Sequence, residues 1–273
     1  MNRIEETFAS LKSAGRKALI PYVMAGDPDL ETTASLVVEL DRRGADLVEL
    51  GVPFSDPIAD GPTIQRAALR ALTGGTTLRS IVETVASIRE HTGIPVVLMT
   101  YYNPVLAYGI GDFCRDAARA GVDGLIVPDL PPEEGTDLSD ACLRHGLTVV
   151  FLVAPTSTSA RIELVNRHTT GFVYCVSLTG VTGARGELAE GVDTFMAQVR
   201  SHTDRPLGLG FGISSPDQAG EAARLADGVI VGSAIINVME AHAGEQDMLR
   251  SVGEYVASLR AGMDRDTPVA VQG

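Results

Sequence analysis

Residues 18–51 read ALIPYVMAGDPDLETTASLVVELDRRGADLVELG, two short apolar runs with an amphipathic run between them. The outer runs, Ala18–Met24 and Asp46–Gly51, are nearly continuous in apolar residues, as strands buried on both faces of a parallel sheet are. The middle run, Leu30–Arg43, carries apolar residues at the three- and four-residue spacing of a helix. This stretch therefore predicts a strand–helix–strand unit with parallel strands.

The same alternation continues to the other end of the chain. Further strands are predicted at Pro95–Tyr101, Gly124–Val127, Thr148–Val153, Phe172–Ser177, Pro206–Gly210 and Gly228–Val231. Helices are predicted between the strands, among them Leu78–His91, Asp137–His145, Ser159–His168, Val192–His202 and Asp217–Leu225. Eight strand–helix units in strict alternation fit an α/β fold of the closed (β/α)8 TIM-barrel type better than a six-stranded doubly wound sheet. Ile4, Phe8 and Leu11 fall at helical spacing and add an N-terminal helix.

The domain organisation is predicted to be simple. A chain of 273 residues could hold two domains, but no stretch resembles a linker, so residues 1–273 are predicted to form one barrel domain. Residues 264–273 have turn formers and little pattern, which favours a loose tail. The longest connections are the excursion after the second strand and the Gly- and Thr-rich segment Leu178–Glu190. Loops after the strands form the active-site rim of such barrels, so these two are the first places to search for function.

Composition excludes several classes of protein. Thirty-five acidic residues against 22 basic ones give a net charge of −13, which disfavours non-specific nucleic-acid binding because no cationic surplus exists. Cys114, Cys142 and Cys175 are widely spaced and predict free buried thiols in a reducing compartment. We expect neither a signal peptide nor a membrane span, because the N-terminus lacks a long apolar core and the longest uncharged stretch, residues 92–111, reads as a strand and a loop. A cytoplasmic protein is the resulting expectation.

The second strand carries the most informative side chain. Strand alternation places Leu47, Glu49 and Gly51 on one face. A carboxyl group in an apolar strand is costly to desolvate, so the pKa of Glu49 should be raised, and such a group can both give and take a proton near neutral pH. The alternative is a structural ion pair between Glu49 and an arginine across the barrel. Asp56 and Asp60 follow in a proline-rich loop, where either could instead be a turn former or a cap for a helix opening at Pro62.

Glycine-rich segments follow the last two predicted strands. Gly208–Ser214 and Val231–Ile235 would let backbone N–H groups approach an anion where a helix begins. Barrel enzymes often bind phosphate at these two loops. Gly180–Gly183, after the sixth strand, could supply a third side of the same cradle.

Missing residue types narrow the chemistry. The only lysines, Lys12 and Lys17, precede the first strand, so no lysine is available for a Schiff base at the catalytic end. All five histidines lie at helix ends, where the helix dipole accounts for them, and no pattern suggests zinc. A Mg²⁺ site on Glu49, Asp56 and Asp60 is a less favoured alternative. Proton chemistry therefore has to rest on carboxyl groups and tyrosines.

Over nearly the whole chain, the sequence resembles that of one protein family. The segment ELGVPFSDPIADGPTIQ (Glu49–Gln65) closely resembles the signature of tryptophan synthase α subunits. Further matching segments, in the family's order, are IPYVMAGDP (Ile20–Pro28), LMTYYNPV (Leu98–Val105), VPDLPPEE (Val127–Glu134), GFVYCVSLTGVTGAR (Gly171–Arg185), GFGIS (Gly210–Ser214) and VGSAI (Val231–Ile235). The resemblance implies a carbon–carbon lyase that splits indole-3-glycerol phosphate into indole and glyceraldehyde 3-phosphate in tryptophan biosynthesis.

The resemblance also implies roles for single residues. Glu49 would protonate C3 of the indole ring and help to remove the side-chain hydroxyl proton, Asp60 would stabilise the positive charge at the indole N–H, and Tyr174 would support Glu49 and the substrate. The residues implied to bind substrate are Tyr22, Thr100 and Phe211 around the indole, Gly183, Gly212, Gly232 and Ser233 around the phosphate, and Thr182 as a closing residue.

The resemblance implies a partner as well. It would be a tryptophan synthase β subunit, which carries pyridoxal phosphate, in an α2β2 complex; the α chain itself would need no cofactor and no metal. The loop Pro53–Asp60 and the segment around Asp129 would face that partner, although Asp129 could equally be a turn residue before a helix near Pro132. Two other functions stay open: a different phosphate-binding barrel enzyme of the same pathway, and a barrel that only activates the β subunit.

Overall fold

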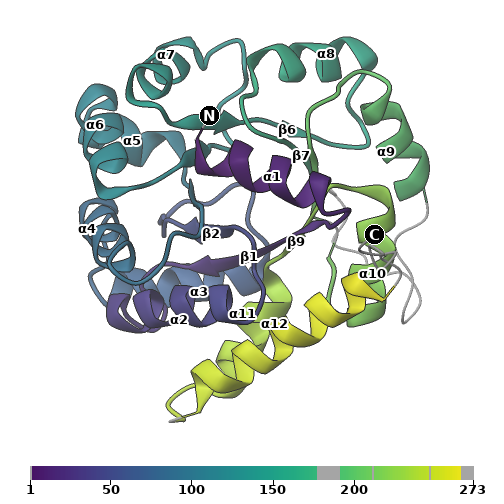
Figure 1. Ribbon diagram of the computed structural model, residues 1–273. Coiled ribbons are helices and arrows are strands. Elements are labelled where there is room, and N and C mark those ends of the chain that lie inside the picture. The colour runs from purple at the N-terminus through teal and green to yellow at the C-terminus, as the bar shows by residue number, and fades with distance from the viewer. Residues whose placement is uncertain (1, 177–190, 211, 246, 266–273) are drawn as a thin grey trace.

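The computed structural model describes residues 2–176, 191–210, 212–245 and 247–265 (Figure 1). In this part of the chain, nine parallel strands form one sheet in the order β5-β4-β3-β2-β1-β9-β8-β7-β6. The strands are β1 (Ala18–Met24), β2 (Val48–Gly51), β3 (Val96–Met99), β4 (Gly124–Ile126), β5 (Thr148–Val150), β6 (Leu152–Val153), β7 (Val173–Val176), β8 (Leu207–Gly210) and β9 (Gly228–Val231). Each predicted strand is present, with ends that differ by a few residues.

The sheet closes at Phe151. The predicted strand Thr148–Val153 is divided there into β5, which pairs with β4, and β6, which pairs with β7. Because β5 and β6 are the two ends of the strand order and are joined through one residue, the sheet forms a barrel of eight strand positions. The predicted TIM barrel is confirmed.

Helices surround the barrel (Figure 1). They are α1 (Arg3–Ser13), α2 (Leu30–Arg42), α3 (Pro62–Thr73), α4 (Leu78–Ile88), α5 (Tyr102–Tyr108), α6 (Ile110–Ala120), α7 (Thr136–His145), α8 (Ser159–His168), α9 (Val192–Arg200), α10 (Pro216–Leu225), α11 (Ser233–Ala241) and α12 (Met248–Asp264). The long excursion after β2 holds both α3 and α4.

Two sequence predictions are corrected by these bounds. Residues 92–111, read as a strand and a loop, contain helix α5, whose first backbone N–H, that of Tyr102, donates to the Asp129 carboxylate at 2.9 and 3.2 Å. That bond comes from another loop, so local sequence could not reveal it. The loose tail was predicted to begin at Asp264, but Asp264 is the last residue of α12 and pairs with Arg260 at 2.7 Å; residues 266–273 lie outside the described part.

The two faces of each strand have different neighbours. One face packs against the surrounding helices, as Val48 and Leu50 of β2 do. The other face lines the interior, where Leu47 and Phe172 pack with apolar residues of α1. Helix α1 crosses one end of the barrel, and its Phe8 ring lies 5.5 Å from that of Phe172 (Figure 1). Helix α1 therefore plugs one end of the barrel. The opposite end, where the carboxyl ends of the strands lie, is the end that can hold an active site.

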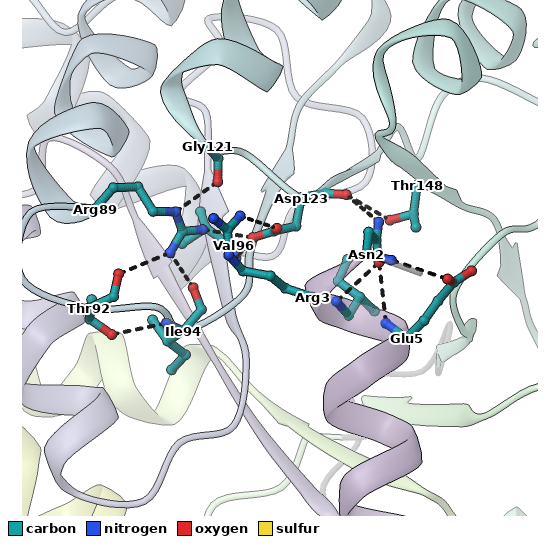
Figure 2. A network of polar contacts seen from close by, with 11 residues as sticks. Asn2, Arg3, Glu5, Arg89, Thr92, Ile94, Val96, Gly121, Asp123 and Thr148 are labelled. Atoms are coloured by element: carbon teal, nitrogen blue, oxygen red, sulfur yellow. Dashed lines mark hydrogen bonds and ion pairs between the residues drawn. The ribbon is translucent and has the colours of Figure 1, made fainter.

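Four side chains repeat one bonding pattern at the plugged end. Their residues precede every second strand position of the barrel. In each case the side chain accepts a hydrogen bond from the backbone N–H of a residue on the preceding strand, and the backbone N–H of the same residue donates to that residue's carbonyl. The pairs are Asp46 with Leu19, Asp123 with Val96, Thr170 with Val149 and Asp227 with Leu207. Figure 2 shows the Asp123 member, whose carboxylate also binds Arg89 at 2.7 Å and Arg3 at 2.8 Å. Polar side chains thus hold neighbouring strands in register, and Asp123 also ties α1 to the barrel.

Within the described residues, none of the helices combines the length and the apolar character that a membrane span requires.

Candidate active site

Glu49 points into the barrel from the middle of β2. It lies beside Tyr22 of β1 and Val97 of β3 in the strand register, and it is fully buried. Neither of its carboxylate oxygens has a hydrogen-bond partner among the described residues. Burial without compensation raises the pKa of Glu49 to about 8. At neutral pH, Glu49 is therefore protonated in most of the protein molecules, and it can still lose its proton.

The competing interpretation of Glu49 as half of a structural ion pair fails in the described part of the chain. No arginine reaches its orphaned oxygens there. A buried carboxyl group without a partner reduces stability, and such groups concentrate where chemistry requires them. The expected raised pKa and the strand alternation are both confirmed.

Two tyrosines stand next to Glu49 in the barrel. Tyr22 and Tyr174 are buried, and desolvation, with the charge of Glu49 adding to it, raises the pKa of each hydroxyl well above its usual value. Both rings fit because glycines face them. A Cβ on Gly51 would lie 2.1 Å from the Tyr22 hydroxyl, and one on Gly210 would lie 3.0 Å from that of Tyr174. The barrel mouth thus places two hydroxyl groups around one dry carboxyl group.

Part of the glycine pattern has a different cause from the one predicted. A Cβ on Gly208 would meet the Phe172 ring at 2.9 Å. Gly208 and Gly210 therefore make room for aromatic rings inside the barrel. The sequence analysis had instead included both glycines in a predicted phosphate-binding segment. Gly212 has φ of +65°, and Gly232 directly precedes α11, where a Cβ would lie 3.3 Å from the Tyr22 side chain.

Asp60 lies half-buried in the loop between β2 and α3. Partial burial raises its pKa, and the nearby Tyr101 hydroxyl partly offsets that rise. The same hydroxyl accepts the Ala59 N–H at 3.0 Å. Asp60 does not cap α3, whose N-cap is Gly61 with no side-chain bond. The capping alternative is wrong for Asp60, which leaves its carboxylate available at the rim.

The acids after β2 do not assemble as a cation site. Asp56 is exposed and accepts the Ser55 hydroxyl at 2.5 Å. In the described residues, the one group of metal-ligand side chains close enough to share an ion is His242, Glu245 and Asp247, on the surface at the end of α11. Glu49, Asp56 and Asp60 do not form such a group, so their geometry gives the Mg²⁺ alternative no support.

The remaining predicted binding residues are only partly described. Ser233 begins α11, next to Gly232. Thr100 is buried, and its hydroxyl donates to the Tyr101 carbonyl at 3.1 Å. Thr182, Gly183 and Phe211 lie outside the described residues.

Comparisons with known proteins agree with this arrangement. The family model for the tryptophan synthase alpha chain matches residues 8–264. The alpha chain of a Geobacter species is 54% identical over 263 residues, which cover 96% of this chain and 98% of the relative. That of Roseiflexus castenholzii is 52% identical, over 95% of this chain and all of the relative. This chain belongs to the tryptophan synthase alpha chain family.

Solved structures of the family share the fold. The alpha subunit from Legionella pneumophila strain Paris has a TM-score of 0.89 and 40% identity, over 97% of this chain and 99% of that one. A chain in a structure of Mycobacterium tuberculosis tryptophan synthase has a TM-score of 0.87 and 40% identity, over 96% of this chain and 98% of that one. The chain is accordingly a carbon–carbon lyase of tryptophan biosynthesis, as members of the tryptophan synthase alpha chain family cleave indole-3-glycerol phosphate.

Tyr101 is the residue that the sequence reasoning missed. The family segment LMTYYNPV suggested Thr100 as a pocket residue, but in the structure Met99 packs against the interior clusters and Tyr101 reaches the Asp60 loop. Alternation along β3, applied as it was to β2, would have pointed to Met99 and Tyr101.

Proposed function

We propose that Glu49 is the proton-transfer group of the cleavage of indole-3-glycerol phosphate to indole and glyceraldehyde 3-phosphate. The observation that carries this proposal is a fully buried carboxyl group at the mouth of a barrel, whose two oxygens have no partner among the described residues. A pKa of about 8 keeps a proton available at neutral pH, which a catalytic acid needs.

One carboxyl group can serve both proton transfers. Protonated Glu49 gives its proton to indole C3, which leaves a positive charge shared with the ring nitrogen. The bond between C3 and the side chain then breaks, its electron pair returns to the ring, and the adjacent hydroxyl becomes the aldehyde. The proton of that hydroxyl goes to the Glu49 carboxylate, so the group ends as it began. Atoms and charge balance without a Schiff base, a metal ion or an oxidant.

Neighbouring groups supply the electrostatics. Ionised Asp60 would hold the indole N–H and stabilise the cation that forms after C3 is protonated. Tyr174 would orient Glu49 and the substrate hydroxyl from β7. Tyr22 and Thr100 would border the indole, together with Phe211. In these assignments one carboxyl group acts as the acid at indole C3, and the other is a fixed anion at the indole N–H.

The phosphate would bind at the other side of the barrel mouth. Helix α11 begins at Ser233 with no side chain capping it, so its first N–H groups can bind an anion directly. Gly212 and Gly232 would allow the close approach, and Gly183 with Thr182 would cover the substrate. The net charge of −13 is no obstacle, because backbone donors do this work.

The test is indole release by the purified chain and by Glu49→Gln. We expect kcat to fall by about 10²–10⁴-fold, because the amide cannot transfer a proton. The unsubstituted chain should lose activity as pH rises through about 8, the pKa at which Glu49 gives up its catalytic proton. Exposed Glu90, changed to Gln, is the matched control and should leave kcat unchanged. A Glu49→Gln protein that kept most of the activity would refute the assignment.

We also propose a tryptophan synthase β subunit as the partner, in an α2β2 complex, with pyridoxal phosphate held by that subunit and no cofactor held by this chain. Ile58, 81% exposed in the loop after β2, and Leu106, 49% exposed on α5, support an interface on the catalytic side. Co-elution with a purified β subunit is the direct check. The buried free thiols suit the reducing cytoplasm, where we place this activity.

A further inference from the structure

Arg70 of α3 joins three elements at the catalytic end of the barrel. Its guanidinium group donates two hydrogen bonds to the Asp27 carboxylate, from Nε to Oδ1 and from Nη2 to Oδ2, each 2.7 Å long. Its third nitrogen, Nη1, donates to Glu240 at 2.6 Å. Asp27 lies in the loop between β1 and α2, and Glu240 lies in α11, which runs beside α3 (Figure 1). One side chain thus connects the β1 loop, α3 and α11.

The contact between Arg70 and Asp27 differs from the other ion pairs on α3. Asp27 is 3% exposed, and a two-pronged arginine–carboxylate contact fixes orientation as well as distance. Arg66, one turn earlier, also binds Glu240, at 2.9 Å, but the Arg66 side chain is 52% exposed. Hydrogen bonds from Arg66 and, to a lesser extent, Arg70 lower the pKa of Glu240 to about 2. Glu240 therefore stays ionised in the pH range in which Glu49 titrates.

The inner face of α3 packs on the active site. One apolar cluster contains Ala67, Ala68 and Ala71 of α3, Tyr22 and Met24 of β1, and Ile236 of α11. Tyr22 lies beside Glu49 in the strand register, and a Cβ on Gly232 would lie 3.3 Å from the Tyr22 side chain. Alanine side chains are too short to fill a gap, so a small movement of α3 would open space next to Tyr22.

We propose that Arg70 is a positioning residue for the active site: by binding Asp27 and Glu240 at once, it keeps α3 packed on Tyr22 and so keeps water away from Glu49. The effect on turnover rests on the proposed function of Glu49, whereas the exclusion of water can be measured without substrate. Helix α3 begins directly after the Asp60 loop, with Gly61 as its N-cap, so the same contacts also hold the end of that loop.

The pKa of Glu49 reports this exclusion of water. Desolvation is the cause of its rise to about 8. The titratable groups that interact with Glu49 are Tyr22 from β1 and Tyr174 from β7, and burial raises the pKa of each far above that range. Asp60, from the loop after β2, acts on Tyr22. Water that entered beside Tyr22 would stabilise the ionised form of Glu49 and lower its pKa.

Arg70→Lys tests the proposal, and Arg66→Lys is its matched control. Lysine keeps a positive charge next to buried Asp27, but one ammonium group cannot form the two-pronged contact and reach Glu240 as well. The control makes the same change one turn earlier, at an exposed ion pair that contributes little. Carbon-13 NMR of the glutamate-labelled chain, with Glu49→Gln for assignment, gives the pKa of Glu49. We expect that pKa to fall from about 8 toward about 7 in Arg70→Lys and to stay in Arg66→Lys.

Turnover and stability separate the possible failures. The basic limb of the kcat–pH profile should move to lower pH in Arg70→Lys together with the pKa of Glu49. A variant that is less stable in urea but keeps the pKa of Glu49 would overturn the inference, because Arg70 would then act on folding alone. Equal shifts in Arg70→Lys and Arg66→Lys would overturn it as well.

Two further variants complete the test. If Arg70→Lys does not fold, Glu240→Ala decides, since it leaves the contact with Asp27 intact and releases α11 from α3. The pKa of Glu49 should fall there too, and an unchanged value would overturn the inference. An active Glu49→Gln, combined with the expected fall of the pKa in Arg70→Lys, would refute the proposed function and leave the role of Arg70 standing.

Discussion

At the scale of single residues, the protein gives up stability for function at Glu49. The Glu49 carboxyl group has 0% exposure and no partner in the described residues. Such a group destabilises the folded state, so stability alone does not explain its presence. Tyr22 and Tyr174, which surround it, exclude water and so maintain its raised pKa. The cost and the catalytic property have one cause, desolvation.

The cost should be measurable as a dependence of stability on pH. The pKa of Glu49 rises from 4.5 to about 8 on folding, so the folded state binds the extra proton in that range. The stability contributed by this proton is therefore fully present below pH 4.5 and is lost as pH rises through about 8, by on the order of 5 kcal/mol for this group alone.

Glu49→Gln should remove this slope. We expect its free energy of unfolding, measured with urea between pH 6 and 9, to decline less with rising pH than that of the unsubstituted chain. Glu90→Gln, at an exposed position, should follow the unsubstituted curve. Parallel curves for all three proteins would mean that Glu49 is hydrated in solution.

At the scale of elements, the plugged end of the barrel holds the strands in register. Asp123 links α1, α4 and β3 through Arg3, Arg89 and the Val96 N–H (Figure 2). The Arg89 side chain is only 12% exposed, so the Asp123 carboxylate offsets part of the cost of burying its charge. Because this end lies away from Glu49, its contribution is to folding and not to chemistry.

Asp123→Ala should therefore destabilise the protein without changing the site. We expect a loss of about 3–5 kcal/mol in the free energy of unfolding, the typical cost of leaving a buried charge without its partner. Asp217→Ala, which breaks a pair with exposed Arg265, should cost under about 1 kcal/mol. Equal losses in the two variants, or a changed KM in folded Asp123→Ala, would contradict this division.

At the scale of the whole molecule, the closed sheet connects every part of the core. Strand pairing runs without a break from β5 through β1 to β6, and the main apolar cluster includes residues from α2 to α12. We propose on these grounds that residues 1–273 fold as one domain.

A single domain predicts one unfolding transition. Tyrosine fluorescence, which is usable because the chain has no tryptophan, should follow the same urea curve as far-ultraviolet circular dichroism. A variant at the plugged end, such as Asp123→Ala, should shift both curves together. Two separated transitions would show that parts of the barrel unfold independently.

The sequence alone was enough for the features that neighbouring residues decide. Alternating apolar runs and helical periods identified every strand position, and strand alternation placed Glu49 on the same face as Leu47, which the structure shows to be the inner one. These signals are local, because a strand or an amphipathic helix records which of its own faces is buried. The resemblance of Glu49–Gln65 to the family's signature segment also predicted the reaction from sequence alone.

Tertiary structure decided the properties that depend on residues far apart in the chain. The barrel closes at Phe151, the Asp129 carboxylate accepts the first N–H of α5, and two tyrosines from β1 and β7 help to bury Glu49. The bond from the Ala59 N–H to the Tyr101 hydroxyl joins the loops after two different strands and has no local signature. Hydration and hydrogen bonding of a buried group are set by whichever side chains surround it in space, and no period along the chain records them.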